Sequence, residues 1–318
     1  MLIKKNDLSD LKEKNIVPDK SEIEIEQKLI QSNNFAPKSP TFSIEIPILL
    51  FYNQINVENL DIKTLFSKNL IFYSFNSQKM TKYLQKCLIN ASKEIITLII
   101  HELKGTFREI IKNKNGNYFC SNLIKICDKN NRIKILKELS NSINEDCIDE
   151  FGTYPIQNLI LYASSEDEFQ LLLSSFNESY KILMPAINAH GTFVIQKLIA
   201  NIPEKSRIKF NSIFVKFISL LSRDTYGAFA LEKFISHTND EKIQMQILNS
   251  ILNDFIKIST HKSGNYIIQS ILTKWWDNEK GRNIKQMIKS KYSILSKNIY
   301  SAHICQLYDK LNNSEENI

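Results

Sequence analysis

The heptapeptide GNYIIQS at residues 264–270 recurs along the chain at an almost constant interval. Near copies begin at Gly116 (GNYFCS), Gly152 (GTYPIQ), Gly191 (GTFVIQ) and Gly227 (GAFALE). Successive glycines are 36, 39, 36 and 37 residues apart, and five of the seven glycines in the chain occupy this one place in the repeat. Self-similarity at a fixed period of this length predicts a solenoid of stacked repeats.

Two weaker copies extend the repeat in both directions: MTKYLQ ends at Gln85 and SAHICQ ends at Gln306. Apolar residues recur at helical spacing, so each unit is predicted to contain a short helix, a glycine turn, a second helix and a longer third helix. The glycine is expected ahead of the second helix, where either a left-handed or a closely packed backbone excludes a side chain. The predicted fold class is all-α, with the 318 residues forming one elongated array rather than two globular domains.

The repeat also divides the chain into segments. Residues 1–40 are polar and contain three prolines, which predicts a disordered tail. Residues 41–65 are richer in apolar side chains but hold no copy of the motif, which predicts an N-terminal cap or a decayed repeat. Residues 66–298 are expected to form about six repeats.

Composition narrows the class of protein further. Forty-one Lys and Arg against 34 Asp and Glu give a formal charge of +7, which suits a polyanionic partner without requiring one. The five cysteines form no CxxC pair and are odd in number, so they are expected to be reduced, mostly buried thiols of an intracellular protein. No apolar run approaches the roughly 20 residues that span a bilayer, so no membrane partner is expected.

Three positions of each second helix are predicted to share one patch. The first and fifth residues after the glycine lie one helical turn apart, and the second lies beside them, while the third and fourth point into the core. Each patch pairs a ring or a cation with amide or small polar groups. In chain order the three positions hold Thr81, Lys82 and Gln85; Asn117, Tyr118 and Ser121; Thr153, Tyr154 and Gln157; Thr192, Phe193 and Gln196; Ala228, Phe229 and Glu232; Asn265, Tyr266 and Gln269; and Ala302, His303 and Gln306.

Repetition separates these patches from ordinary surface residues. A single glutamine on a helix is usually solvated, and a ring beside it is usually packed locally. Here five of the seven fifth positions are Gln and a sixth is Glu, although core packing requires no amide there. The pattern therefore indicates a binding surface that follows the repeat.

The motif at this spacing resembles the Pumilio, or PUF, RNA-binding repeat, a module that reads one base per helical repeat. The resemblance covers roughly residues 66–318. It implies a right-handed α-solenoid in which the second helices line a concave surface, the first and fifth residues hydrogen-bond a base edge, and the second stacks between bases. It also implies single-stranded RNA as the partner, running antiparallel to the protein. Residues 299–318 resemble the C-terminal cap of the family, so Gln306 is not counted among the expected base readers.

The resemblance assigns two bases at the 5′ end of the RNA. The family uses Asn with Gln, here Asn265 and Gln269, for uracil. An ionised Glu232 offers only acceptors, which suits the two N–H donors on the Watson–Crick edge of guanine. The RNA is therefore expected to begin 5′-UG. Ala228 lacks the usual hydroxyl, Ser121 is shorter than Gln and Lys82 replaces a ring, so the 3′ half of the RNA motif is left open.

The expected function is sequence-specific binding of messenger RNA, in a 3′ untranslated element that begins UG, with repression or decay through recruited repressor or deadenylation machinery. The protein is expected to be a cytoplasmic monomer. Two alternatives stay open: a nucleolar PUF-like factor of ribosome assembly, and a helical protein-binding scaffold of the HEAT or armadillo kind. No cofactor, metal or catalysis is expected, because HELKG at residues 101–105 lacks the second His of HExxH and nothing pairs a nucleophile with a base.

Overall fold

The computed structural model describes residues 65 and 71–315 of the chain. All of them lie within one compact unit, Ser43–Ile318. The segments predicted at 1–40 and, apart from Leu65, at 41–65 lie outside the described residues, and the proposed boundaries remain predictions. The described part contains nineteen α-helices and one 3-10 helix and no strand, so the predicted all-α class is confirmed.

The helices form six three-helix units and a final helix. The first three units are α4 (Ile71–Ser74), α5 (Gln78–Ile89) and α6 (Lys93–Glu102); α7 (Phe107–Lys112), α8 (Gly116–Ile126) and α9 (Lys129–Leu139); and α10 (Ile143–Asp146), α11 (Thr153–Tyr162) and α12 (Glu166–Ser174). The next three are α13 (Ser179–Ala186), α14 (Gly191–Asn201) and α15 (Ile208–Lys216), with η4 (Glu204–Arg207) before α15; α16 (Ile218–Arg223), α17 (Thr225–Ser236) and α18 (Glu241–Asn253); and α19 (Phe255–Ser259), α20 (Gly264–Trp275) and α21 (Glu279–Leu295). The last helix is α22 (Ala302–Glu315).

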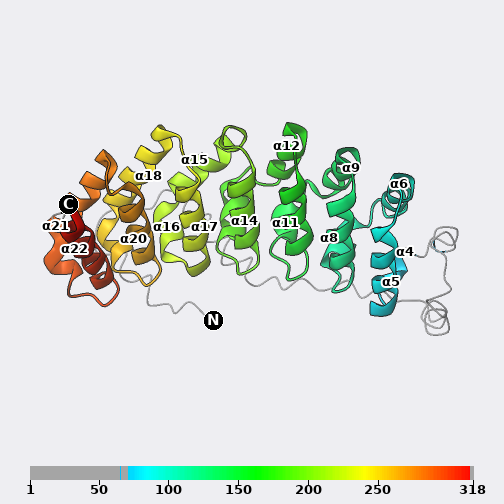
Figure 1. Cartoon of the computed structure of the whole chain (residues 1–318), viewed down its shortest axis with the longest axis horizontal. Helices are drawn as coiled ribbons and strands as arrows, with labels where there is room; N and C mark the ends of the chain where they lie inside the picture. Colours follow the sequence, from blue (N-terminus) through cyan, green and yellow to red (C-terminus); the bar gives the residue numbers. More distant parts are fainter. Residues whose placement is uncertain (1–64, 66–70, 316–318) are drawn as a thin grey trace. The chain divides into compact units, whose positions relative to one another are not determined.

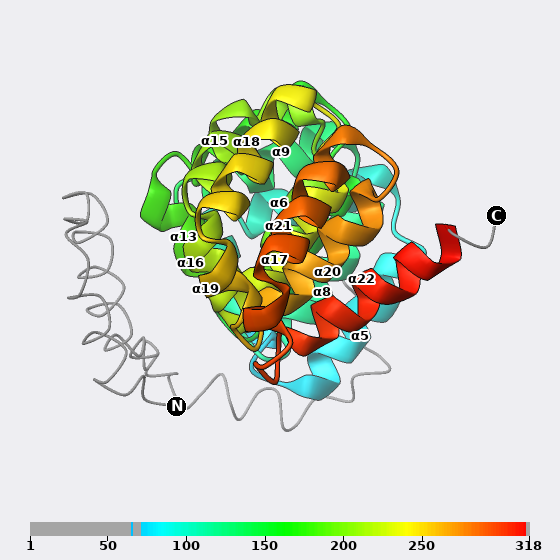
Figure 2. The same ribbon diagram turned by 90° about the vertical axis from the view of Figure 1, so that its left-hand side faces the viewer.

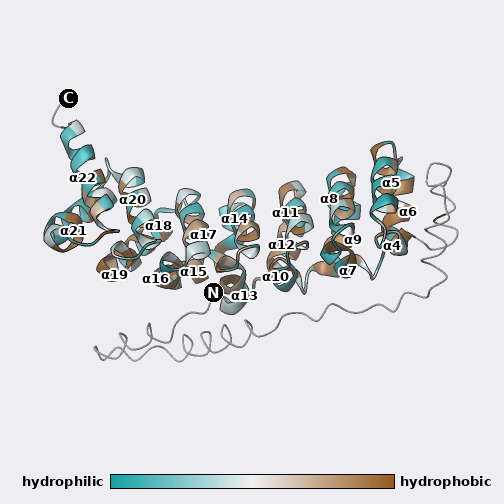
Figure 3. Ribbon diagram, turned by 90° about the horizontal axis from the view of Figure 1, so that it is seen from below, coloured by the Kyte–Doolittle hydropathy of each residue, from teal (hydrophilic) through white to brown (hydrophobic). Residues whose placement is uncertain are grey.

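The units stack in chain order, as expected of a solenoid. Each second helix contacts the next, from α5 through α8, α11, α14, α17 and α20 to α22 (Figure 1). Figure 3 shows this row of second helices on one side and the short first helices on the other. Seen along the stack, the third helices α9, α15 and α18 lie together as a further layer (Figure 2). The predicted longer third helix holds only for α18 and α21, whereas α9, α12 and α15 are no longer than the second helices before them.

The core lies between these layers and is built from the third and fourth motif residues. Phe119, Val194, Ile195, Ile267 and Ile268 are at most 1% exposed, so the prediction that these positions point inward is confirmed. Complete burial of one such side chain stabilises the fold by about 1.5–3 kcal/mol. Because each second helix from α8 to α20 contributes a buried pair at these positions, the core runs continuously through these units.

The repeated glycine is required by close packing against backbone, not by a left-handed conformation. A methyl group at Gly116, Gly191 or Gly264 would lie 2.7, 2.7 or 2.3 Å from the carbonyl oxygen six residues earlier, near the end of the first helix of the unit. The only glycine with positive φ among the described residues is Gly105, which is outside the motif. Of the two explanations that the sequence allowed, the structure supports the second.

An Asn or Asp three residues before the glycine fixes the same turn, a feature that the sequence reasoning missed. The Oδ1 atom of Asn188 accepts hydrogen bonds from the backbone N–H groups of His190 and Gly191, at 2.8 and 3.0 Å. In the α20 unit His261 takes this place, and its Nδ1 accepts from the N–H of Ser263 at 3.1 Å. The signal was visible in the sequence, because the same column reads Asn113, Asp149, Asn188, Asp224, His261 and Asn298.

We expect Gly191→Ala to destabilise the protein, by about 1–3 kcal/mol for overpacking of a rigid site. The sign is informative, because at an unconstrained helical position Ala is about 1 kcal/mol more favourable than Gly. Urea unfolding followed by circular dichroism measures the difference. A variant as stable as the wild type, or more stable, would contradict the close-packing explanation.

A buried ion pair joins the second and third units. The Nε of Arg132 lies 2.8 Å from Oε1 of Glu168, and Arg132 Nη1 donates to the Cys127 carbonyl. The other oxygen of Glu168 accepts from the Ser164 N–H and the Ser165 hydroxyl. Burial raises the pKa of the Glu168 carboxyl, but these hydrogen bonds and the charge of Arg132 outweigh burial and hold the pKa below its ordinary value.

The lowered pKa of Glu168 predicts a loss of stability in acid. The unfolded chain binds this proton more readily, so the stabilisation is complete above the unfolded pKa of about 4.3 and is lost as the pH falls through the lower folded pKa. Glu168→Gln should therefore reduce the free energy of unfolding at pH 7, by about 3 kcal/mol if the cost matches other broken buried pairs. The gap from the wild type should narrow below pH 4. Glu109→Gln, an exposed site, is the control; a gap independent of pH would contradict the assignment.

Candidate nucleic-acid interface

Aromatic side chains at the second motif position form an exposed row on the second helices. The ring row, as we call it, consists of Tyr118, Tyr154, Phe193, Phe229 and Tyr266, and its members are between 54% and 67% exposed. Lys82 on α5 occupies the same place and is also exposed. Large apolar side chains that stay in solvent at one position of five successive units are typical of a binding surface, because folding alone gains nothing from them.

The residues at the first motif position are almost completely buried. The sequence predicted that they would share one surface patch with the second and fifth positions, so this part of the prediction differs from the structure. Thr81, Asn117, Thr153, Thr192 and Asn265 are at most 2% exposed, and Ala228 is also buried. The sequence could not reveal this burial. Spacing shows only that the first and fifth residues share a helix face, whereas the burial of the first residue depends on the neighbouring unit of the stack.

Two of the buried threonines are bonded to the following unit. The hydroxyl of Thr153 donates to the carbonyl of His190 at 3.2 Å, and that of Thr192 donates to the carbonyl of Tyr226 at 3.1 Å. Each hydroxyl has one proton, and that proton is used in the inter-unit bond. The remaining lone pairs can only accept.

The buried first residue orients the amide of the fifth residue in three units. Gln157 Nε2 donates to Thr153 at 3.1 Å, and Gln196 Nε2 donates to Thr192 at 3.3 Å. In α20, Asn265 uses its Nδ2 to donate to the carbonyls of His261 and Lys262, so its Oδ1 accepts from Gln269 Nε2 at 2.8 Å. Each glutamine therefore presents its carbonyl oxygen and one N–H to solvent in a fixed order.

The other units lack this clamp. Glu232 is exposed, Ala228 offers no polar atom to it, and within the described residues its carboxylate makes no hydrogen bond or ion pair. Asn117 donates to the carbonyls of Asn113 and Lys114 as Asn265 does in its unit, but Ser121 is half-buried and no hydrogen bond joins it to Asn117. These two units are thus the ones in which the sequence departs from a hydroxyl or amide paired with glutamine.

The helices α5 and α22 lie beyond the two ends of the ring row and carry the two weaker copies of the motif. The hydroxyl of Thr81 donates to the carbonyl of Ser77 at 3.0 Å, and no hydrogen bond joins it to Gln85. On α22, Ala302 is half-buried, while His303 and Gln306 are exposed and lie 3.3 Å apart from Nδ1 to Oε1.

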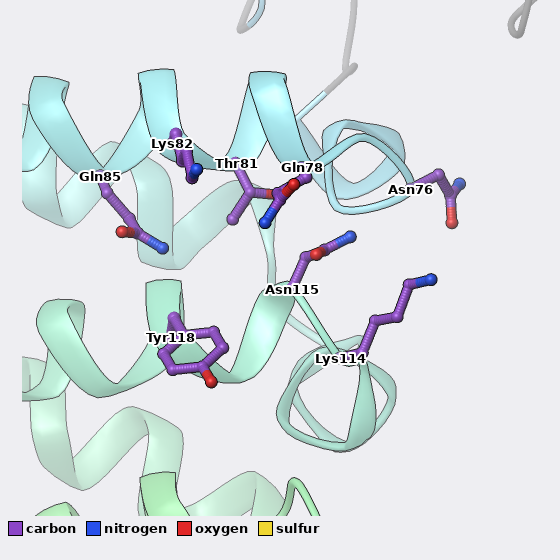
Figure 4. Close-up of a pocket in the computed structure, with 8 residues that line it drawn as sticks. All are labelled: Asn76, Gln78, Thr81, Lys82, Gln85, Lys114, Asn115 and Tyr118. Atoms are coloured by element: carbon purple, nitrogen blue, oxygen red, sulfur yellow. The ribbon is translucent and has the colours of Figure 1, made fainter.

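A pocket of about 630 Å³ lies between α5 and α8 (Figure 4). The α5 side and the loop before it contribute Asn76, Gln78, Thr81, Lys82 and Gln85, and the α8 side contributes Lys114, Asn115 and Tyr118. Gln85 points from α5 toward α8, Asn115 points back toward the start of α5, and the Tyr118 ring lies over α8 (Figure 4). Four of these residues were predicted site residues, so the structure brings the patches of the first two units together.

The described part of the chain shows no metal site and no helix that could span a membrane, and most of its thiols are buried. No group of three His, Cys, Asp or Glu side chains is placed to hold a metal ion there. All five cysteines are free, and four are buried, as predicted. Burial raises the pKa of the Cys120 and Cys147 thiols above the ordinary value, which leaves them unreactive. No helix in these residues is both long and apolar enough to cross a bilayer.

Five segments of the chain match the family model of the Pumilio-family RNA binding repeat, at residues 83–104, 107–140, 186–209, 218–252 and 254–275. The chain belongs to the Pumilio (PUF) family. The predicted resemblance is therefore confirmed, and the family is one of binding repeats, a non-enzymatic kind of protein. The PUF unit α10–α12 falls between two matched segments and carries Pro155, which lies in the first turn of α11 where its missing N–H costs no helical bond.

Similar proteins include Pumilio homolog 12 of Arabidopsis thaliana, 22% identical over 253 residues, which are 77% of this chain and 41% of that protein. Suppressor protein MPT5 of Saccharomyces cerevisiae is 23% identical over 205 residues, 60% of this chain and 23% of that protein. This PUF chain thus spans less than half the length of these curated relatives.

Solved structures share the solenoid fold. PUF-8 in complex with PBE-RNA superimposes with a TM-score of 0.69 at 16% identity, covering 93% of this chain and 86% of that one. The RNA-binding domain of yeast Puf5p bound to AAT2 RNA gives a TM-score of 0.68 at 20% identity, covering 81% and 70%. The Puf4 RNA binding domain bound to a 3′ UTR recognition sequence of HO endonuclease RNA gives 0.68 at 20%, covering 73% and 72%. At these identities the likeness establishes the fold of the PUF array.

Proposed function

We propose that this PUF array binds single-stranded RNA sequence-specifically along its second helices. The observation that carries the proposal is the ring row, because exposed rings at one position of successive units offer evenly spaced stacking surfaces. Beside them, clamped glutamines present one donor and one acceptor each to a base edge. Several structural relatives are known in complex with RNA, which supports the same partner here.

The proposed specificity is clearest at the C-terminal end, where the 5′ end of an antiparallel strand would lie. The fixed order of donor and acceptor on Gln269 complements uracil, whose edge presents an N–H donor beside a carbonyl acceptor. The unpaired carboxylate of Glu232 supplies two acceptors for the N–H groups of guanine. The strand would therefore begin 5′-UG.

In the cell, the proposed targets are messenger RNAs with such an element in the 3′ untranslated region. Repression or decay would follow from recruited repressor or deadenylation machinery, with the chain acting as a cytoplasmic monomer. The 3′ UTR sequence in the Puf4 complex supports this choice of RNA. A nucleolar role in ribosome assembly, or a protein-binding scaffold, would leave the clamped amides and the Glu232 carboxylate without a use.

Binding of a short 5′-UG RNA, compared with a scrambled RNA of the same length at one salt concentration, tests the function. Stacking on a ring is worth about 1–3 kcal/mol, so Tyr266→Ala should weaken binding of the 5′-UG RNA about ten-fold or more. Fluorescence anisotropy gives both affinities. Equal affinity for the two RNAs would defeat the base-reading proposal and favour the less selective nucleolar role, and undiminished binding by the variant would show that Tyr266 does not stack.

Glu232 is expected to select guanine at the second base. Adenine and uracil would turn an acceptor toward the carboxylate, and such a mismatch costs about 1–3 kcal/mol, a preference of roughly ten-fold. Glu232→Gln restores a donor and should relax the preference while the neighbouring U stays selected. Competition among four RNAs that differ only at this base measures it. Glu241→Gln, which removes an exposed charge from α18, is the matched control; if both variants shift all four affinities equally, Glu232 reads no base.

A further inference from the structure

The pocket between α5 and α8 carries a different charge from the places that follow it in the stack. Two lysines, Lys82 and Lys114, line it, and no acidic side chain does. At the place of Lys82 the next five units have an aromatic ring, and at the place of Lys114 the next four units have Glu150, Ala189, Thr225 and Lys262, so no later junction has a lysine at both places. The double positive charge is thus specific to the first junction.

Both ammonium groups are available to a ligand. Lys82 and Lys114 are exposed, and neither has an ion-pair partner among the residues that the structure describes. The amide side chains of Asn76 and Gln78, also exposed, add neutral donors to the same pocket. The wall is fixed, because Asn115 Nδ2 donates to the carbonyl of Phe75 at 3.0 Å and ties the α4–α5 loop to α8.

The same junction lacks the devices for reading a base. The Thr81 hydroxyl donates within its own unit, to the carbonyls of Ser77 and Ser74, and no hydrogen bond from Gln85 reaches it, so the Gln85 amide is not held in a set order. One of the two stacking faces is a lysine, which acts as a compact, hydrated point charge rather than as a flat surface. A lysine ammonium is well suited to a phosphate group, and amide N–H donors complete such a site.

From the charge, the free donors and the absence of an amide clamp, we infer that this pocket binds a backbone phosphate near the 3′ end of the RNA. The inference rests on the proposed function, because an antiparallel strand that begins at α20 reaches α5 with its 3′ end. The strand is therefore selected by its bases at the C-terminal units and held by charge at the first junction, whatever base lies there.

The salt dependence of binding tests the inference. Lys82→Gln/Lys114→Gln removes both charges from the pocket, and Lys86→Gln/Lys125→Gln removes two exposed lysines from the same helices outside it. Each phosphate contact of a single strand adds about −0.7 to the slope of log affinity against log salt. We expect the pocket variant to lose about that much of the slope on a 5′-UG RNA, with its G preference at the second base unchanged. The control should keep the wild-type slope.

Neutral linkages locate the phosphate. Methylphosphonates placed one at a time in the 3′ half of the RNA should weaken wild-type binding several-fold at one linkage, and that linkage should cost the pocket variant nothing further. A pocket variant that matches its control, or one that loses a base preference at the 3′ end, would overturn the inference while leaving RNA binding intact. Failure of the wild type to bind the RNA, or to prefer UG, would instead overturn the proposed function.

Discussion

The approach of each second helix to the end of the first helix of its unit is the constraint on which the rest of the array depends. The contact is backbone to backbone, and it leaves no room for a Cβ atom at Gly116, Gly191 or Gly264. A side chain of any size would push the second helix outward and change its tilt. Since the same contact recurs in every unit with a motif glycine, the second helices start from equivalent positions, and residues at equal places in the motif fall in rows.

The turn before the glycine reinforces this placement by a different kind of interaction. One Asn or Asp side chain accepts from two N–H groups that the helix cannot satisfy itself, as Asp224 does for Tyr226 and Gly227 at 2.8 and 2.7 Å. Sterics thus set how close the helix lies, and the cap sets where it begins. The ring row depends on both, because a helix that started one residue later would rotate each ring by about 100°.

The period, the helical class and the inward-pointing pair of residues could be predicted because each depends only on the spacing of residues along the chain. The glycine interval gave the unit, and residues such as Val194 and Ile195 gave the core face. Three features could not be obtained in this way. The length of the third helix depends on the loops between units. The burial of Thr192 depends on the neighbouring helix. The pocket requires Lys82 and Lys114, 32 residues apart in the chain, to line the same space. The Asn and Asp column could also have been predicted, because it lies at a fixed offset of three residues before each glycine.

The hydroxyls of Thr153 and Thr192 each serve two neighbours at once, a carbonyl in the next unit and a glutamine in their own. If these threonines were exchanged in order to change the RNA sequence that the array binds, two interactions would be lost together. One is the hydrogen bond to the next unit, and the other is the bond that orients the glutamine amide. The α17 unit lacks this double bond, because the Ala228 side chain cannot hydrogen-bond either the next unit or Glu232. A substitution at Glu232 would therefore leave the contact between the units unchanged. A protein built this way is easiest to re-programme at the unit where its own pattern is least regular.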